Sequence, residues 1–224
     1  MVKISAAPSA PKTELVIWDW NGTLLDDTQL CYDIANEMRV ERGMSPLPDV
    51  DVYRGLFRFP VIEYYRQMGY TFETESYEDI SVEFVGLYAK RVHTCPLQPH
   101  AEETLAEIGR RGVPQVLLSA TGADRLHQQA ELFGLTRRFQ RVIGCENNLA
   151  HGKADKARKL LAESGVAPER AAFIGDTDHD YEIAASIGCR CLLLASGHQL
   201  PAHLETLGVP VMHSLSEVLE ELNL

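Results

Sequence analysis

The amino-acid sequence predicts an α/β protein whose core is a mainly parallel sheet with helices on both faces. From Glu14 onward, apolar runs of strand length alternate with segments in which apolar residues recur at helical spacing. Glycines closely follow four of these helical segments, as is typical of helix ends: Gly112, Gly134, Gly165 and Gly188. Such strands are joined by right-handed crossovers, which makes the sheet parallel and buried. The expected result is a Rossmann-like core of three layers.

The expected elements follow one another along the chain. Strands are expected at residues 15–18, 115–118, 141–143, 171–174 and 190–194, and core helices at 101–111, 123–133, 153–164 and 181–187. The segment between the first two strands breaks the alternation, because it is rich in aromatic residues and shows helical patterns at 30–42, 60–68 and 77–92. We therefore expect a core formed by residues 14–26 and 96–224, with an inserted helical domain over residues 27–95.

Composition limits the class of protein. The chain has 224 residues, enough for one large domain or a domain with an insertion. Its net charge of −11 argues against a nucleic-acid or anionic-membrane binder, and no apolar run approaches the ~20 residues of a membrane span. Five scattered cysteines favour buried thiols in a reducing cytoplasm. Residues 1–13 lack an apolar signal region and are expected to form a disordered tail. The sequence does not define an oligomeric state.

Two motifs directly follow expected strands and carry oxygen groups. Asp19 opens the run Asp19-Trp20-Asn21-Gly22-Thr23 at the carboxyl edge of the sheet, where open α/β sheets place their ligands. Its carboxylate is suited to attack phosphorus and form an aspartyl-phosphate, or simply to cap a turn. Ser119, followed by Ala120, combines a hydroxyl with backbone N–H groups that suit a phosphate oxygen or a helix N-cap.

Two further motifs carry charge. Lys153 stands at the start of a helix, where it is poorly placed for the helix dipole but well placed to hold an anion, with Lys156 as the second choice. The turn from Asp176 to Asp180 contains three carboxylates, which repel one another unless a cation balances them. Hard carboxylate oxygens suit Mg²⁺.

In order and spacing, these four motifs resemble those of the haloacid dehalogenase-like hydrolases, whose phosphatase members read Asp-x-Asp-Gly-Thr. The helical insertion falls where that family has its cap domain, and Gly188 and Ser196-Gly197-His198 fall where phosphoglycolate-phosphatase-like members continue. The resemblance implies that Asp19 is the nucleophile. It also implies Mg²⁺ held by Asp19, the Asn21 backbone carbonyl and Asp176, with Asp180 orienting water. The residues implied to hold the phosphoryl group are Ser119, Ala120 and Lys153, with the backbone N–H groups of Trp20 and Thr23.

Asn21 departs from the family pattern. The family's phosphatases have an aspartate here that protonates the leaving alcohol and later deprotonates the attacking water, which an amide does not do. General acid–base help is typically worth ~10²–10⁴-fold. Hydrolysis of alkyl phosphates is therefore expected to be slow. For esters whose leaving group needs no proton, the rate of hydrolysis is expected to fall less. Alternatively, Asp27 or a residue of the cap supplies the proton, or the fold is retained with little catalysis.

Other chemistries of the family fit less well. Phosphonoacetaldehyde hydrolase has Asp-Trp-Ala-Gly-Thr but needs a cap lysine, and here the first lysine of the insertion is Lys90, at its end. Dehalogenases have a tyrosine at the position of Asn21 and need no metal, which does not match the acidic turn. In the insertion, Arg58 beside Phe59 is expected to bind a substrate carboxylate or second phosphate, and Arg54 to form a surface ion pair. His179 is expected to be a loop residue rather than a ligand.

The sequence thus predicts a cytoplasmic, Mg²⁺-dependent phosphatase that acts on a small phosphorylated metabolite through an aspartyl-phosphate. The competing class is a non-hydrolytic protein that binds a phosphorylated ligand, or stalls as an aspartyl-phosphate for regulation or phosphotransfer.

Overall fold

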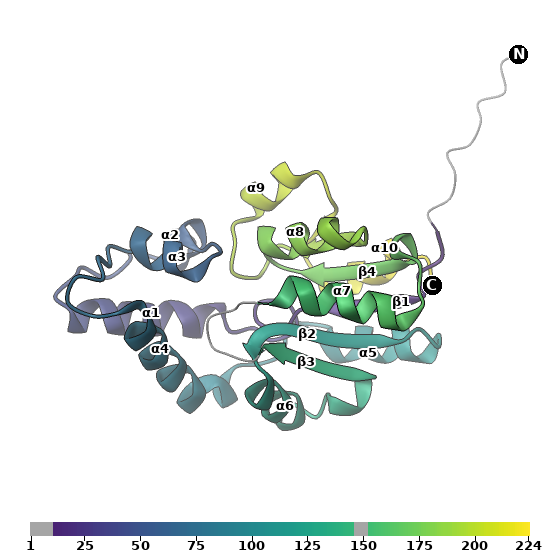
Figure 1. Cartoon of the computed structure of the whole chain (residues 1–224), viewed down its shortest axis with the longest axis horizontal. Coiled ribbons are helices and arrows are strands. Elements are labelled where there is room, and N and C mark those ends of the chain that lie inside the picture. The colour runs from purple at the N-terminus through teal and green to yellow at the C-terminus, as the bar shows by residue number, and fades with distance from the viewer. Residues whose placement is uncertain (1–10, 146–151) are drawn as a thin grey trace, which may run out of the picture.

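The computed structural model describes residues 11–145 and 152–224. Within these ranges, six parallel strands form one sheet in the order β3-β2-β1-β4-β5-β6 (Figure 1). The strands are β1 (Leu15–Trp18), β2 (Gln115–Gly122), β3 (Arg141–Cys145), β4 (Ala171–Gly175), β5 (Arg190–Leu194) and β6 (Val211–Met212). In the register of the sheet, Ile17 of β1 lies between Val116 and Phe173. The predicted Rossmann-like fold is confirmed.

The sheet separates two apolar clusters, which makes three layers. Along β1, Val16 and Trp18 belong to one cluster, whereas Leu15 and Ile17 belong to the other, because successive side chains of a strand point to opposite faces. The following helices pack against the strands: α5 (Ala101–Arg110), α6 (Ala123–Leu132), α7 (Lys153–Ser164), α8 (Asp178–Ile187), α9 (Pro201–Leu204) and α10 (Val218–Glu221). Helices α5, α6 and α10 contribute to the first cluster, and α7, α8 and α9 to the second.

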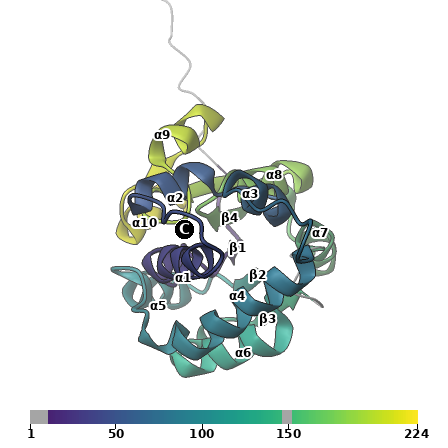
Figure 2. The same cartoon turned by 90° about the vertical axis from the view of Figure 1, so that its left-hand side faces the viewer.

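Four helices between β1 and β2 form a lobe beyond the carboxyl ends of the strands (Figures 1 and 2). They are α1 (Thr28–Glu41), α2 (Val50–Leu56), α3 (Val61–Gln67) and α4 (Tyr77–Arg91), and are called the α1–α4 lobe below. The chain builds β2 and β3 on one side of β1 before it returns to build β4, β5 and β6 on the other. Open α/β sheets bind ligands where strand order reverses in this way, so the ends of β1 and β4 define the expected site.

Several elements differ from those predicted. Strand β2 continues through Ser119 to Gly122, with an irregular register after Leu118, so Ser119 lies inside the strand rather than at its end. Helix α8 begins at Asp178 because Thr177 and Asp180 form a capping box, and His179 therefore lies in a helix rather than in a loop. Strand β6 and helices α2, α9 and α10 were not predicted.

Two other local expectations concern the glycines at helix ends and the N-terminal tail. The four glycines predicted to end helices all adopt positive φ angles, of 68–76°. Most of the expected tail, residues 1–10, lies outside the described residues, whereas Thr13 is buried and donates its N–H to Asn223 O. Among the described residues, no helix has the length and apolarity needed to cross a bilayer.

Candidate active site

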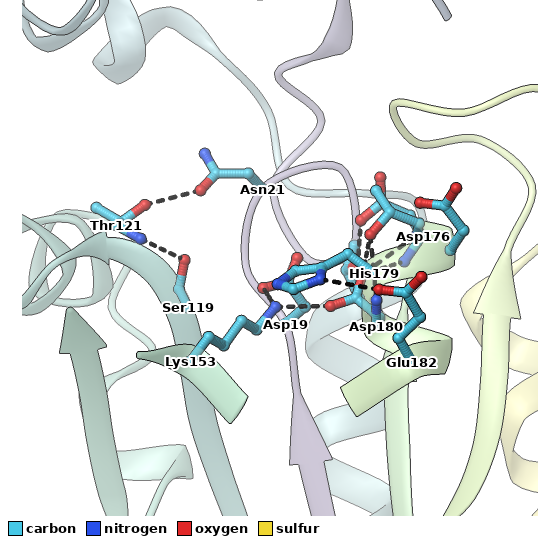
Figure 3. A network of polar contacts seen from close by, with 12 residues as sticks. Asp19, Asn21, Ser119, Thr121, Lys153, Asp176, His179, Asp180 and Glu182 are labelled. Atoms are coloured by element: carbon cyan, nitrogen blue, oxygen red, sulfur yellow. Dashed lines mark hydrogen bonds and ion pairs between the residues drawn. The ribbon is translucent and has the colours of Figure 1, made fainter. Parts of the chain in front are cut away.

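Three carboxylates and one lysine meet at the carboxyl ends of β1 and β4. Oxygen atoms of Asp19, Asp176 and Asp180 lie within 4.8 Å of one another. Lys153, the first residue of α7, places its Nζ 2.6 Å from an oxygen of Asp19 and 2.6 Å from an oxygen of Asp180 (Figure 3). All four side chains are buried, with Lys153 only 4% exposed. Motifs 134 residues apart in the sequence are thus joined in one charged cluster.

Two glycine-containing loops fix Asp176. Its Oδ1 accepts a hydrogen bond from the Thr23 hydroxyl at 2.8 Å, and its Oδ2 accepts one from the backbone N–H of His198 at 2.7 Å. A Cβ atom at Gly22 or Gly197 would lie 2.3 or 2.2 Å from Asp176 Oδ2. Glycine is therefore required at both positions for the carboxylate to stay in place.

Asp180 is held by the start of α8. Its Oδ2 accepts from the Thr177 hydroxyl at 2.7 Å and from the backbone N–H groups of Asp176 and Thr177. Its Oδ1 is the oxygen that meets Lys153. Asp178, the third carboxylate of the predicted acidic turn, instead accepts from Gln199 Nε2 at 2.8 Å and lies 3.0 Å from His203 Nε2. The turn therefore supplies two carboxylates to the cluster and one to the protein surface.

Burial and mutual repulsion perturb the protonation of the cluster. Burial is the main cause that raises the pKa of Asp19 to about 8; the attraction of Lys153 opposes this rise, whereas Asp180 and Asp176 add to it. Burial likewise raises the pKa of Asp176 to about 6. For Asp180, burial also raises the pKa, but the attraction and hydrogen bond of Lys153 outweigh it and the pKa lies below its usual value. One ammonium group is thus insufficient to keep all three carboxylates ionised.

The donor set of this cluster fits a divalent cation. Three buried carboxylates face a single lysine, and hard oxygen donors of this kind bind Mg²⁺. A cation beside Asp19 and Asp176 would supply the positive charge that their raised pKa values indicate is lacking.

Asn21 faces away from the carboxylate cluster and is fully hydrogen bonded. Its Nδ2 donates to Asp27 Oδ2 at 2.7 Å and to the Tyr88 hydroxyl at 2.7 Å. Its Oδ1 accepts from the Thr121 hydroxyl at 2.8 Å (Figure 3). The amide therefore links β1, β2 and the α1–α4 lobe. The Asp27 acceptor on one side and the Thr121 donor on the other suit an amide and set its orientation.

A second group of buried polar side chains, formed by Asp27, His198 and Tyr53, lies next to Asn21. The sequence analysis did not predict that these residues lie together. Asp27 Oδ1 accepts from the backbone N–H of Gly22 at 2.8 Å and lies 3.2 Å from His198 Nε2, while His198 Nδ1 lies 2.9 Å from the Tyr53 hydroxyl. Burial would raise the pKa of Asp27 and lower that of His198, but their mutual attraction outweighs burial in both, so they form an ion pair. Two features of the sequence pointed to this group separately: Asp27 is a carboxylate close to Asp19 that could serve as a proton source, and His198 belongs to the run Ser196-Gly197-His198 after the last predicted strand.

A cavity of about 210 Å³ connects these groups to the α1–α4 lobe. Seven of the predicted site residues line it: Asp19, Asn21, Ser119, Ala120, Lys153, Asp176 and Asp180. Three others do not: the Trp20 indole donates to Gln129, the Thr23 hydroxyl donates to Asp176, and Arg58 Nε donates to Leu56 O at 3.2 Å. The Thr23 N–H, predicted to hold a phosphoryl oxygen, donates to Trp20 O at 3.3 Å.

The remaining residues singled out from the sequence serve other contacts. Arg54 pairs with Asp51 at 3.5 Å, as expected, but it is mostly buried and also donates to the carbonyls of Ala195 and Gln199, which ties the lobe to the core. Lys156 donates to Gly144 O. His179 stacks on Phe59 of the lobe, with ring centroids 4.4 Å apart.

A buried carboxylate–lysine centre at the switch point of a parallel sheet, with a helical insertion after the first strand, defines a class of α/β hydrolase. Residues 16–194 match the family model of haloacid dehalogenase-like hydrolases, and the chain belongs to that family. It is 27% identical to N-acetylmuramic acid 6-phosphate phosphatase of Pseudomonas aeruginosa over 198 residues, which cover 85% of each chain. It is 25% identical to phosphoglycolate phosphatase 1 of the same organism over 191 residues, covering 82% of this chain and 70% of that one.

A solved structure supports the fold. The chain superposes on a haloacid dehalogenase-like family protein, SP0104 from Streptococcus pneumoniae, with a TM-score of 0.79 and 21% identity, covering 93% of this chain and 98% of the other. The two curated relatives differ in the substrate that each name gives, so the similarity supports a phosphatase scaffold more strongly than any one substrate.

Proposed function

We propose that the protein is a Mg²⁺-dependent phosphatase that hydrolyses a small phosphomonoester through an aspartyl-phosphate on Asp19. The observation that carries this proposal is Lys153, which bridges Asp19 and Asp180 beside Asp176 at the sheet edge. Phosphoryl transfer depends mainly on positioning and on neutralisation of charge, and this cluster offers a nucleophile, a fixed ammonium and a carboxylate set for a cation.

Each residue has a proposed part in the reaction. Asp19 attacks the phosphorus, and Ser119, Ala120 and Lys153 hold the phosphoryl oxygens. The Asp19 side chain, the Asn21 backbone carbonyl and Asp176 would hold Mg²⁺, with Asp180 orienting its water. When bound, the ion neutralises charge on the transferring phosphoryl group. Lys153 also holds Asp19 in position through the 2.6 Å contact.

The α1–α4 lobe is proposed to act as a cap domain over this site. It contributes Tyr88 to the hydrogen bonds of Asn21 and lines the same cavity. The names of the relatives support a small phosphorylated substrate, and the five cysteines, which form no disulfide among the described residues, support a reducing, cytoplasmic setting. Asn21 is proposed to slow the hydrolysis of esters whose leaving group needs a proton.

The first test is turnover of 4-nitrophenyl phosphate, whose leaving group barely needs an acid, with Mg²⁺ and with EDTA. We expect release that depends on Mg²⁺ and is abolished by Asp19→Asn. Asp176→Asn is expected to raise the Mg²⁺ concentration required. The matched control is Asp178→Asn, in the same acidic turn but bonded to Gln199, which is expected to retain activity.

Other outcomes would change the assignment. If the folded, Mg²⁺-loaded protein releases nothing, the phosphatase proposal is wrong. Intact mass spectrometry after incubation with the phosphoester then separates the two remaining classes. A phosphoryl adduct that is lost in Asp19→Asn identifies a stalled intermediate, whereas an unmodified chain that binds phosphate identifies a binding protein.

A further inference from the structure

The part of the cavity formed by the α1–α4 lobe is aromatic and uncharged. Twelve residues within the span 28–91 line the cavity; eight of them are tyrosine or phenylalanine and none is ionic, whereas Asp27, directly before α1, also lines the cavity but is paired with His198. They include Phe84 and Tyr88 of α4, whose rings stack with centroids 6.2 Å apart. An apolar, aromatic wall stabilises a flat ring by burial and by ring–ring contact.

The basic residues that line the cavity all belong to the core. These are Lys153, His198 and Arg125; Lys153 is held by two carboxylates, and His198 by Asp27. Arg58, the residue predicted to bind a substrate carboxylate, does not line the cavity. A carboxylate on a leaving group that enters the α1–α4 lobe would therefore meet no basic side chain of the lobe, and burial of an unpaired charge is costly.

Two hydroxyl groups in this wall have weak partners at best. The hydroxyls of Tyr64 and Ser81 are buried and form no hydrogen bond of normal geometry within the part of the chain that the structure describes, and each interacts only weakly with a tyrosine, Tyr53 for Tyr64 and Tyr77 for Ser81. Both residues line the cavity. Buried hydroxyls are normally satisfied, so a polar substituent on the ring of a ligand, or a water beside it, is the expected partner.

Asn21 gives an independent constraint on the leaving group. Its amide is held by Asp27, Tyr88 and Thr121 and has no proton to give. A phenol has a pKa of about 10, whereas alkyl alcohols are weak acids like water, with a pKa of about 15.7. A phenolate therefore departs without a general acid far more readily than an alkoxide does.

We infer that the enzyme is specific for aryl phosphomonoesters, with the aromatic ring bound in the α1–α4 lobe. This inference rests on the proposed phosphatase function. The cavity of about 210 Å³ is smaller than the ~300–1,000 Å³ of pockets for drug-sized ligands, which favours a single ring.

In the proposed reaction, an Asp19 carboxylate oxygen forms a bond to phosphorus while the bond from phosphorus to the phenolic oxygen breaks. The electron pair leaves with the phenolate, which takes a proton from water. A water molecule then attacks the same phosphorus, the bond to Asp19 breaks, and the proton of that water is released to solvent. The net change is ester plus water to phenol plus inorganic phosphate.

The test compares kcat/KM for three substrates in Mg²⁺: phenyl phosphate, 2-phosphoglycolate and acetyl phosphate. Acetyl phosphate has a good leaving group but no ring, so it separates leaving-group reactivity from ring binding. We expect a KM for phenyl phosphate at least tenfold below that for acetyl phosphate, and little turnover of 2-phosphoglycolate. Phe84→Leu is expected to raise the KM for phenyl phosphate about three- to tenfold and to leave acetyl phosphate unchanged.

Matched variants control for folding. Phe139→Leu removes a buried ring outside the cavity and is expected to leave every KM unchanged. Tyr64→Phe and Tyr70→Phe each remove a buried hydroxyl that makes no hydrogen bond of normal geometry among the described residues, but of the two only Tyr64 lines the cavity. Only Tyr64→Phe is expected to change the KM for 4-hydroxyphenyl phosphate.

The two proposals fail in different ways. A KM for phenyl phosphate no lower than that for acetyl phosphate, a kcat/KM for 2-phosphoglycolate above that for phenyl phosphate, or no selective effect of Phe84→Leu would overturn the aryl specificity and leave the phosphatase standing. No Mg²⁺-dependent turnover of any of the three would overturn both.

Discussion

Asn21 is the residue that most separates this protein from the phosphatase pattern of its family, and its contacts show that it is not an isolated change. The carboxylate of Asp27 lies 2.7 Å from the Asn21 amide nitrogen, and the Tyr88 hydroxyl donates to the same carboxylate at 2.6 Å. In the family pattern the carboxylate that serves as the acid is at position 21. Here position 21 is an amide, and the carboxylate beside it belongs to Asp27. This carboxylate is satisfied by donors and paired with His198, which makes it a poor proton donor.

This arrangement predicts that Asn21→Asp alone does not restore an efficient enzyme. Two carboxylates 2.7 Å apart repel, so the variant is expected to lose stability on the order of 1–3 kcal/mol. The double variant Asn21→Asp with Asp27→Asn exchanges the two groups and restores a donor facing an acceptor. It is expected to remove the repulsion but to lose the buried ion pair of Asp27 with His198, and to raise turnover of glycerol phosphate by about 10²-fold.

Urea unfolding and glycerol phosphate turnover of both variants check this prediction. Asp27→Asn alone serves as the control, because it loses the ion pair with His198, as the double variant does, without adding an acid at position 21. A single Asn21→Asp variant as stable as the wild type would contradict the observed contact between the two side chains.

At the scale of elements, the sequence predicted the structure best where a pattern is local. The strand at Leu15–Trp18 and the helix at Lys153–Ser164 have the predicted bounds, because continuous apolar runs and a closing glycine mark them. Strand β6 has two residues, too few to show any period, and α2 contains Gly55 and two valines that weaken its helical pattern. Both are held by tertiary packing rather than by propensity.

The site also divides into residues that a local sequence pattern predicts and residues that only the tertiary structure brings together. Asp19, Ser119, Lys153 and Asp176 were predicted to lie together because each was expected to follow a strand or open a helix on one edge of the sheet, and all four line the cavity. The pairing of Asp27 with His198 joins residues 171 positions apart and leaves no periodic signal in the sequence. Arg58 was misplaced because the direction of a side chain in a loop depends on the local bend, and its neighbours Phe57 and Phe59 line the cavity instead.

The loop after β5 is the element that locks Asp176, which leads to a further prediction. Gly197→Ala places a methyl group 2.2 Å from Asp176 Oδ2 and is expected to lower Mg²⁺ affinity by about 10–100-fold. Gly86→Ala, in α4 with no atom within 4 Å of the added methyl, is the control and is expected to bind Mg²⁺ normally. Calorimetric titration with Mg²⁺ measures both, and equal affinities would show that the loop does not position the carboxylate.

At the scale of the whole molecule, the lobe and the core are joined through the site itself. Phe57 of the lobe stacks on His198 of the core with ring centroids 5.0 Å apart, and Arg54 donates to carbonyls of the loop after β5. The backbone N–H of His198 in turn holds Asp176. Changes in the charge of the cluster are therefore expected to affect the stability of the whole chain.

Metal-free protein is expected to lose stability as the pH rises from about 5 to 8. Burial is the main cause that raises the pKa of Asp19 to about 8, whereas an unfolded aspartate has a pKa of about 3.9. Over this range the folded protein keeps a proton that the unfolded chain has released. The stabilisation from this proton is therefore full below pH 4 and is lost as the pH approaches 8.

Asp19→Asn removes this titration and is expected to make the metal-free protein more stable at pH 7.5 by on the order of 1–3 kcal/mol, with a smaller difference at pH 5. Mg²⁺ is expected to stabilise the wild type most at the higher pH, because it replaces the missing positive charge. Urea midpoints measured from pH 5 to 8, in EDTA and in Mg²⁺, test both points. Asp178→Asn, whose carboxylate is bonded outside the cluster, is expected to follow the wild type. If the curves of Asp19→Asn and wild type run parallel, the proton on Asp19 does not contribute to stability.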